Sequence, residues 1–138
     1  MIAYVGSSVL LRVILGQRNR LKYWNKIQTG VASALVEVEC LRTLDRLRLK
    51  GSLSGEELAL RRETVYRLME EMEVMELGPT VLSRASQPLP TTLGNLNAIH
   101  LSSALIWREQ NRAELVMATH DLSLATAAKA CGLEVTGT

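Results

Sequence analysis

Residues 115–135 read LVMATHDLSLATAAKACGLEV, and this stretch decides the expected fold. The apolar run Leu115–Ala118 predicts a buried strand, and Thr119–Asp121 is a polar turn directly after it. Small and apolar residues at helical spacing then predict a helix over 122–131. After a glycine, which is favoured just beyond a helix end, Leu133–Val135 is typical of another short strand. A strand, a helix and a strand in this order predict a parallel βαβ unit.

The rest of the chain continues this alternation of strands and helices. Ile2–Val5 predicts a first strand, which the tight turn Gly6-Ser7-Ser8 follows. Ser54 and Glu57 have the spacing of a capping box at the start of a long helix. The other expected elements are a helix over 9–14, a polar helix over 18–28, strands over 31–32 and 74–77, helices over 34–50, 54–73 and 95–110, and a helix start at Pro79. The helix over 34–50 is expected to bury one apolar stripe formed by Leu35, Val38, Leu41, Leu44 and Leu47.

This order predicts an α/β fold, formed by residues 1–138 as a single domain, with a mainly parallel sheet covered by helices on both sides. In such sheets ligands bind outside the carboxyl ends of the strands. We therefore expect chemistry at three segments, the turn 6–8, the segment Ser33–Glu39 and the turn Thr119–Asp121. Ser33 is also the expected N-cap of the helix that follows it.

Composition excludes several classes of protein. The 138 residues are 47% hydrophobic and 22% charged, which is typical of an ordinary globular domain. The net charge of +2 is too small to predict nucleic-acid binding by itself. Two distant cysteines without a C-x-x-C pattern argue against structural zinc, and no phosphate-binding glycine loop or nucleophile elbow is present. Arg12 interrupts the apolar N-terminus, so we expect no membrane span and a cytoplasmic location.

Some polar residues at the turns have a purely structural explanation. Asp121 lies between a strand and a helix, where N-capping is the default role, and Ser7 and Ser8 are expected to cap the helix after the first strand. A lone helical histidine such as His100 is more often a packed or hydrogen-bonded imidazole than a ligand. We therefore assign His100 no catalytic role.

Glu39 and Asn97 each admit two interpretations. Glu39 could form a surface ion pair with Arg42, three residues further along the helix. It also lies within two turns of Ser33, so it could face the same cavity as Asp121. Asn97 lies in the first turn of its helix, where its amide could cap the helix or be solvated.

Four segments, taken in order, resemble PIN domains, in particular the VapC-type toxins of bacterial and archaeal toxin–antitoxin pairs. IAYVGSSVLLRVILG (2–16) resembles the family's strand followed by D-[ST]-S-x-L-[LV], and SALVEVECLRTL (33–44) resembles its S-x-x-x-x-x-E helix start. NAIHLSSAL (97–105) is similar to D-A-[IL]-H-L-A-x-A, and ELVMATHDLSLATAAKACGLEV (114–135) to its strand, T-x-D turn, helix and G-L-x-V ending. The ordered set spans nearly the whole chain and is more specific than any single segment.

The resemblance implies a three-layer α/β/α sandwich and an endoribonuclease that depends on Mg²⁺ or Mn²⁺ and uses four acidic residues. Such acids suit Mg²⁺, which prefers carboxylate oxygens and keeps waters that can be activated against a phosphodiester. The four family positions fall on Gly6, Glu39, Asn97 and Asp121. Glu39 and Asp121 would then be metal ligands, Asn97 a weaker neutral ligand, and Gly6 no ligand at all.

Two of the four acids are therefore missing from this chain. Aspartate at positions 6 and 97 would raise Asp and Glu from 14 to 16 and match the 16 Lys and Arg residues, so the missing charge is concentrated at one place. Because the loss of ligands weakens a metal site, we expect weak metal binding and impaired or absent cleavage. Natural loss of the acids and their deliberate replacement both fit these residues.

The sequence leaves two other functions open. The chain could be a non-catalytic PIN-like pseudo-nuclease that binds RNA or an antitoxin without cleaving. It could also be an unrelated small α/β interaction domain, in which Glu39, Asn97 and Asp121 would not converge. The family resemblance implies three partners, a cognate antitoxin, an RNA such as tRNA or rRNA, and a second copy of the chain in a homodimer.

Overall fold

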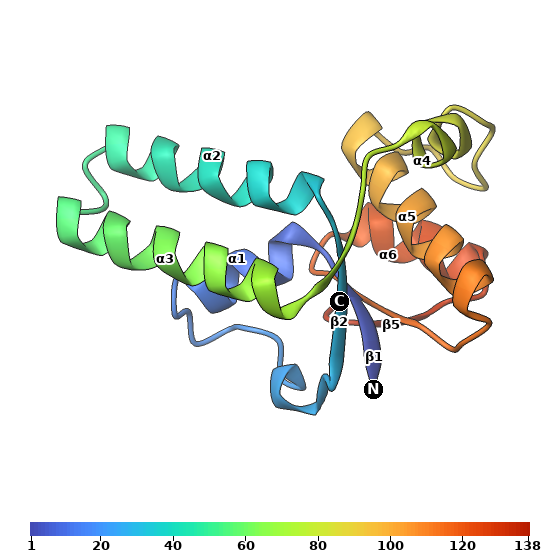
Figure 1. The fold of residues 1–138 in the computed structure, drawn as a ribbon, viewed down its shortest axis with the longest axis horizontal. Helices are drawn as coiled ribbons and strands as arrows, with labels where there is room; N and C mark the ends of the chain where they lie inside the picture. Colours follow the sequence, from blue (N-terminus) through green and yellow to red (C-terminus); the bar gives the residue numbers. More distant parts are fainter.

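The computed structural model describes all residues 1–138 and contains a five-stranded parallel sheet between two layers of helices (Figure 1). The strands are β1 (Ile2–Val5), β2 (Thr29–Ser33), β3 (Glu73–Met75), β4 (Val116–Ala118) and β5 (Glu134–Thr136). They lie in the order β3-β2-β1-β4-β5, and every neighbouring pair is parallel. The expected α/β class is confirmed, and each strand lies within two residues of its expected position.

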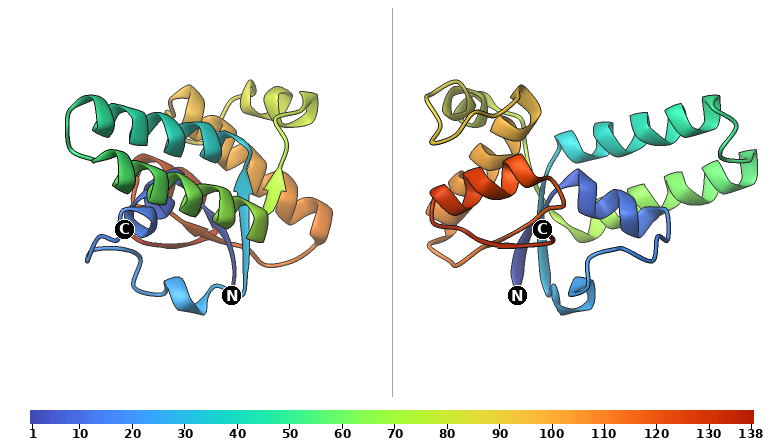
Figure 2. Two further views of the ribbon diagram at one scale, coloured as in Figure 1. Left: turned by 60° about the vertical axis from the view of Figure 1, so that its left-hand side comes forward. Right: turned by 180° about the vertical axis from the view of Figure 1, so that it is seen from behind.

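The helices divide between the two faces of the sheet. They are α1 (Ser7–Ile14), the 3₁₀ turn η1 (Trp24–Lys26), α2 (Leu35–Leu49), α3 (Gly55–Glu71), α4 (Pro79–Ala85), α5 (Asn95–Asn111) and α6 (Leu122–Ala130). Helices α1, α2 and α3 lie on one side of the sheet and α4, α5 and α6 on the other, and the α2–α3 hairpin extends beyond the sheet (Figures 1 and 2). None of the helices combines the length and the apolar character that crossing a membrane requires.

Each face of the sheet has its own apolar core, because alternate side chains of a strand point to opposite faces. On the central strand β1, Ala3 and Val5 join the cluster under α1, α2 and α3, whereas Tyr4 joins the cluster under α5 and α6. Tyr4 pairs in register with Val31 of β2 and Met117 of β4, which both belong to the same cluster as Tyr4. Both faces of the central strands are therefore dry, as expected for a parallel sheet.

Of the two helix caps expected at Ser54 and Ser33, the first is confirmed by its hydrogen bonds and the second is shifted by one residue. Ser54 Oγ accepts from the backbone N–H of Glu57, and the Glu57 carboxylate accepts from the N–H of Ser54, both at 3.1 Å, so the capping box before α3 is complete. Ser33 Oγ accepts from the N–H of Leu35 at 3.1 Å. The expected N-cap role of Ser33 is therefore wrong by one residue, because Ser33 is the last residue of β2 and Ala34 is the N-cap of α2.

The polar helix expected over 18–28 is wrong. Only η1 is helical there, and its hydrogen bonds join Trp24 N to Leu21 O and Ile27 N to Trp24 O, three residues apart. These apolar residues repeat every third position, which matches the three residues per turn of a 3₁₀ helix. Leu21 is buried and Trp24 and Ile27 pack against the core, so the segment is held by these anchors.

The apolar stripe expected for α2 is confirmed only in part, because Leu44 is fully buried and Leu41 packs against the core, whereas Val38 does not. The side chain of Val38 is 56% exposed, and the buried residues of the helix are Val36, Cys40 and Leu44. A stripe that advances by three residues drifts around a helix of 3.6 residues per turn, whereas a spacing of four stays close to one face over two turns. The buried face of α2, which packs against α1 and α3, is therefore rotated from the expected one.

Candidate active site

A cavity of about 400 Å³ lies at the carboxyl end of the sheet. Its lining includes all four positions that the resemblance singled out, Gly6, Glu39, Asn97 and Asp121. They come from the N-termini of α1, α5 and α6 and from the second turn of α2. The convergence argues against an unrelated α/β domain in which these side chains would lie apart. The rest of the lining is formed by Ser7, Ser8, Gly94, Asn95, Leu96, His100, Thr119 and Leu124.

Gly6 joins the central strand to the cavity. Its N–H donates to the carbonyl oxygen of Ala118 at 2.9 Å, and its φ of −74° and ψ of 158° are those of an extended N-cap residue. A Cβ at this position would come no closer than 3.4 Å to another atom, the same Ala118 oxygen. The backbone at Gly6 would therefore accept an aspartate without strain, although the glycine itself offers no side-chain ligand.

A hydrogen bond from His100 orients the carboxylate of Glu39. His100 Nε2 lies 2.6 Å from Glu39 Oε1, and His100 Nδ1 lies 2.7 Å from the hydroxyl of Tyr4. Because an ionised carboxylate only accepts, Nε2 carries the proton of this bond. Of the two interpretations of Glu39, the ion pair with Arg42 is not formed, since Arg42 pairs with Asp45 at 3.3 Å. The imidazole is only 2% exposed, which confirms that His100 is a packed and hydrogen-bonded residue.

Two groups close to Glu39, the Tyr4 hydroxyl and the Cys40 thiol, are protonated at neutral pH. Burial raises the pKa of the Tyr4 hydroxyl well above its ordinary value, and the nearby Glu39 charge raises it further. Burial, followed by the same charge, raises the pKa of the Cys40 thiol to about 12. At neutral pH neither group supplies an anion to the cavity. The negative charge of the site therefore comes from carboxylates alone.

Asp121 is the N-cap of α6, which confirms its structural explanation. Its Oδ1 accepts from the N–H of Leu124 at 2.9 Å, and its own N–H donates to Thr119 Oγ1 at 3.0 Å. The capping role does not remove Asp121 from the cavity, because its second oxygen is left out of this bond. One side chain thus ends the turn after β4 and contributes charge to the site.

The expected capping by Ser7 and Ser8 is wrong. Gly6 is the N-cap of α1 and the two serines are already helical, so their side chains make no capping bond. Ser8 Oγ instead accepts from the N–H of His120 at 3.0 Å and lies 3.4 Å from Thr119 Oγ1. Ser8 therefore connects the start of α1 to the turn before α6 by hydrogen bonds, and both of these segments line the cavity.

Asn97 lies in the first turn of α5, and its side chain lines the cavity, as does that of Asn95. Neither α1 nor α5 carries an acidic residue in its first turn. Both helices therefore present the partial positive charge of their N-termini without a carboxylate beside it. This half of the cavity is neutral and rich in hydrogen-bonding groups.

The residues present do not fit a resident divalent ion. The cavity offers two carboxylates, and one oxygen of each is already used, by His100 in the case of Glu39 and by Leu124 in the case of Asp121. No group of three or more His, Cys, Asp or Glu side chains is placed to hold a metal. Mg²⁺ requires near-octahedral oxygen coordination, to which two single carboxylate oxygens and one amide contribute little.

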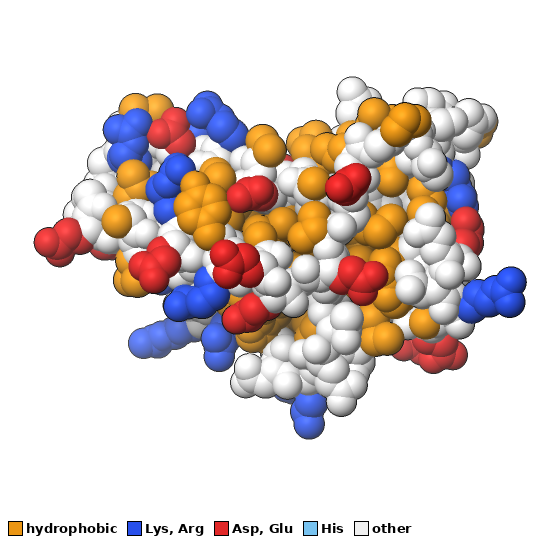
Figure 3. All heavy atoms as spheres, in the orientation of Figure 1, with side chains coloured by type: hydrophobic (Ala, Val, Ile, Leu, Met, Phe, Trp, Pro, Cys, Tyr) orange, Lys and Arg blue, Asp and Glu red, His pale blue; other side chains and the backbone are white.

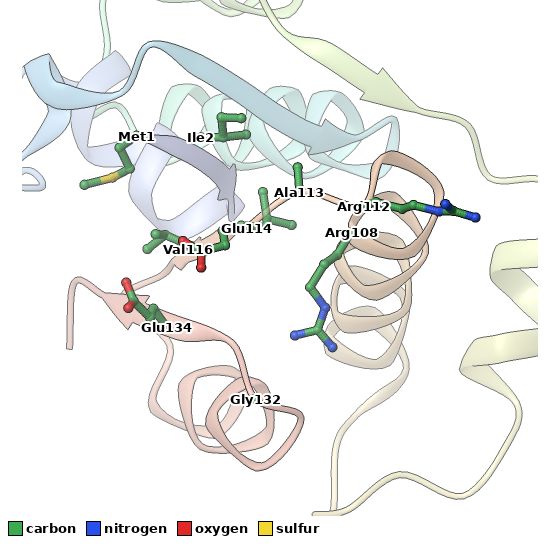
Figure 4. Close-up of a pocket in the computed structure, with 10 residues that line it drawn as sticks. Met1, Ile2, Arg108, Arg112, Ala113, Glu114, Val116, Gly132 and Glu134 are labelled. Atoms are coloured by element: carbon green, nitrogen blue, oxygen red, sulfur yellow. The ribbon is translucent and has the colours of Figure 1, made fainter.

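A larger cavity of about 680 Å³ lies at the opposite, amino end of the strands (Figure 4). Arg108 and Arg112 line it together with Glu114 and Glu134, so its charges do not favour one class of ligand. Arg108 is engaged with the carbonyl of Cys131 at 3.1 Å, and Arg112 points away from the other labelled residues. This second cavity contains none of the expected site residues. It also lies away from the carboxyl ends of the strands, where parallel sheets bind ligands.

Comparison with known proteins supports the assignment of the fold. A family model of the PIN domain matches residues 3–130. The chain belongs to the PIN domain family. Among solved structures, this PIN domain is similar to a chain in the crystal structure of VapBC2 from Rickettsia felis bound to a DNA fragment from their promoter. The TM-score is 0.65 with 14% sequence identity, over 98% of this chain and 97% of that chain. No curated protein matches the sequence.

The bond from His100 to Glu39 is the feature of this PIN domain that the sequence does not predict. The two residues are 61 positions apart, and no local pattern connects them. Gly94 and Leu96 were also unexpected in the cavity lining, which they join because α5 begins there. The acids and their replacements were found through the ordered motifs of the family.

Proposed function

We propose that this PIN domain is a VapC-like toxin of the endoribonuclease type in which metal-dependent cleavage of RNA phosphodiesters is impaired. The observation that carries the proposal is the cavity at the carboxyl end of the sheet. It gathers Gly6, Glu39, Asn97 and Asp121, yet only two of these are carboxylates. Membership of the PIN family supports the nuclease class, and the depleted donor set supports the impairment.

The cofactor belongs to the same proposal. Mg²⁺ is often bound through one or two carboxylates together with phosphate oxygens of a substrate. Glu39 and Asp121 each keep one oxygen for such an ion, and Asn97 can add its amide oxygen. We therefore expect Mg²⁺ or Mn²⁺ to bind weakly, and cleavage that depends on the ion to be slow or absent.

The proposed partners follow from the VapC-like class. We expect a cognate antitoxin, a tRNA or rRNA substrate in the cytoplasm, and a homodimer, and the similarity to a chain of a VapBC2 complex is consistent with the antitoxin. An antitoxin that places a basic side chain in the cavity would find half of the usual negative charge. The attraction between opposite charges across that contact is correspondingly weaker.

A second candidate function is a non-catalytic pseudo-nuclease that binds RNA or an antitoxin. The observation that favours it is the missing set of three metal ligands. The two candidates differ in what aspartate at positions 6 and 97 would do. A recently disabled nuclease regains activity, whereas a binding module whose other active-site residues have also diverged does not.

The deciding experiment compares RNA cleavage by this chain and by the Gly6→Asp/Asn97→Asp variant, with Mn²⁺ and with a chelator. We expect the variant to cleave only with Mn²⁺ and this chain to cleave little or not at all. Mn²⁺ affinity, measured by electron paramagnetic resonance of the free ion, should rise at least about tenfold for the variant.

The matched control is Asn19→Asp/Gly55→Asp, which adds the same two charges at exposed positions outside the cavity. A Cβ at Gly55 meets no atom within 4 Å, so this change leaves the fold intact. The control should neither bind Mn²⁺ more tightly nor cleave. Silence of the cavity variant, with its folding verified by circular dichroism, would contradict the impaired nuclease and favour the binding module.

A further inference from the structure

The charges of the molecule are divided between the two sides of the sheet. Residues 1–71, which include α1, α2 and α3, contain 12 of the 16 Lys and Arg residues and 8 of the 14 Asp and Glu residues. This part has a net charge of +4, and residues 72–138 have a net charge of −2. In Figure 3 most of the visible Lys and Arg side chains lie over the half that carries these three helices.

On α2 a row of polar and basic side chains begins at the candidate active site. Glu39, Thr43 and Arg46 of α2 and Lys50, its C-cap residue, are spaced by four, three and four residues, which places them on one flank of the helix. Hydrogen bonds link the first three, from Thr43 Oγ1 to the carbonyl of Glu39 at 2.9 Å and from Arg46 Nη2 to Thr43 Oγ1 at 3.1 Å. We call these four residues the α2 row.

The two cations of the α2 row are free of acidic partners. Neither Arg46 nor Lys50 forms an ion pair, and both are exposed. Arg42 and Arg48 differ, because both of them pair with Asp45, at 3.3 and 2.9 Å. The unpaired positive charge of α2 is thus confined to the flank that leads away from Glu39.

We propose that the α2 row guides the backbone of a single-stranded RNA out of the candidate active site, with Arg46 and Lys50 on successive phosphates. This inference rests on the proposed function, which makes RNA the ligand of the cavity. At 1.5 Å per residue, Arg46 and Lys50 lie about 10.5 Å and about 16.5 Å along the helix axis from Glu39. Unpaired cations at such intervals suit a polyanion that begins in the cavity, and phosphate contacts of this kind set position rather than sequence preference.

A simpler explanation of the same charges is electrostatic support for the helix. Cations in the last turn of a helix interact favourably with its C-terminal partial charge, and Arg46 lies in the last turn of α2. Arg48 lies there too, but on another flank and paired with Asp45. Removal of Arg48 therefore tests the helix-end effect without touching the α2 row.

The test measures RNA binding without metal. A short fluorescein-labelled single-stranded RNA is titrated, in chelator and at several salt concentrations, with this chain, with Arg46→Gln/Lys50→Gln and with Arg48→Gln/Lys129→Gln. Both variants lower the net charge from +2 to 0. We expect roughly tenfold weaker binding for the α2 row variant and a slope of log affinity against log salt that is shallower by about 1.4. The control variant should bind like the unmodified chain.

Each other outcome has a defined meaning. Equal weakening by both variants, or displacement of the RNA by poly-glutamate as readily as by unlabelled RNA, would overturn the α2 row as an RNA site. Binding that neither variant changes would also overturn it, while the proposed function would stand. If this chain binds no RNA at low salt and the Gly6→Asp/Asn97→Asp variant does not cleave, both proposals fall.

Discussion

The hydrogen bonds from Tyr4 to His100 and from His100 to Glu39 run from the central strand to the candidate active site. Tyr4 is fully buried on β1 and His100 is 2% exposed on α5, so both ends of the imidazole are enclosed by protein. The orientation of the Glu39 carboxylate is therefore set by the core and not by solvent. A side chain fixed in this way presents only one free oxygen to the cavity.

We predict that Tyr4→Phe destabilises the fold by about 1–3 kcal/mol, because His100 Nδ1 would be left buried without a hydrogen-bond partner. The measurement is the free energy of unfolding in urea at neutral pH. Tyr23→Phe is the matched control, since Tyr23 is 47% exposed and its hydroxyl reaches water. Similar small effects of the two variants on the free energy of unfolding would show that the hydrogen bond between Tyr4 and His100 contributes little to stability.

At this scale the sequence predicts residue types better than their contacts. The ordered motifs identify Glu39, Asn97 and Asp121, and the capping role of Asp121 follows from its place between a strand and a helix. The partner of Glu39 does not follow, because Arg42 lies three residues away on the same helix whereas His100 is 61 residues distant. The nearer cation pairs elsewhere, and the buried imidazole makes the bond.

Helix α3 depends on local interactions at its start. The capping box of Ser54 and Glu57 satisfies N–H groups that would otherwise lack partners at the first turn. Only Val65 of this 17-residue helix is fully buried. Because its other contacts with the core are made by partly buried side chains, the capping box contributes a larger share of its stability than it would in a deeply buried helix such as α5.

We predict that Ser54→Ala lowers the free energy of unfolding by about 1 kcal/mol at neutral pH, whereas Ser52→Ala changes it little. Ser52 is exposed and uses only its backbone N–H, toward the carbonyl of Leu47. The two variants thus differ in a capping bond and not in composition.

The other half of the capping box, the Glu57 carboxylate, should contribute stability that depends on pH, and Glu57→Gln measures it because the N–H of Ser54 is kept. The hydrogen bond from the N–H of Ser54 lowers the pKa of Glu57 below its ordinary value. A carboxyl whose pKa is lower in the folded state stabilises the fold above its unfolded pKa, and this contribution is lost as the pH falls through the lowered pKa. The difference in the free energy of unfolding between this protein and Glu57→Gln should therefore shrink as the pH falls below about 4.3. A difference that stays constant down to pH 2 would contradict a role for ionised Glu57.

Element boundaries follow from local chemistry, and orientations do not. The start of α3 is encoded by its capping box, and the turn after β4 by Thr119–Asp121. The buried face of α2 depends instead on how the helix packs against α1 and α3, which selects Val36 rather than Val38. The polar composition of the segment 18–28 is compatible with an exposed helix. Its apolar residues repeat every third position, however, and anchor a 3₁₀ turn.

The two cores of the molecule differ in how they protect a cysteine. Cys40 belongs to the cluster under α1, α2 and α3 and is fully buried, whereas Cys131 follows α6 and is partly exposed. Thiol reagents attack the thiolate, and burial raises the pKa of Cys40 to about 12. Reaction of Cys40 therefore requires α2 to separate from α1 and α3, the helices that it packs against, so its rate reports the opening of this layer of the fold.

We predict that a disulfide reagent such as DTNB modifies this protein at pH 8 in two phases, a fast one at Cys131 and a slow one at Cys40. Cys131→Ser should abolish the fast phase and Cys40→Ala the slow one. Because Cys40 is protonated in the folded state and ionises near pH 8.5 when unfolded, the free energy of unfolding should fall as the pH rises above that value. Cys40→Ala should remove this part of the alkaline loss and Cys131→Ser should not. If both thiols react at the same fast rate in the folded protein, the layer of α1, α2 and α3 opens readily. The flank of α2 beside the candidate site would then be mobile as well.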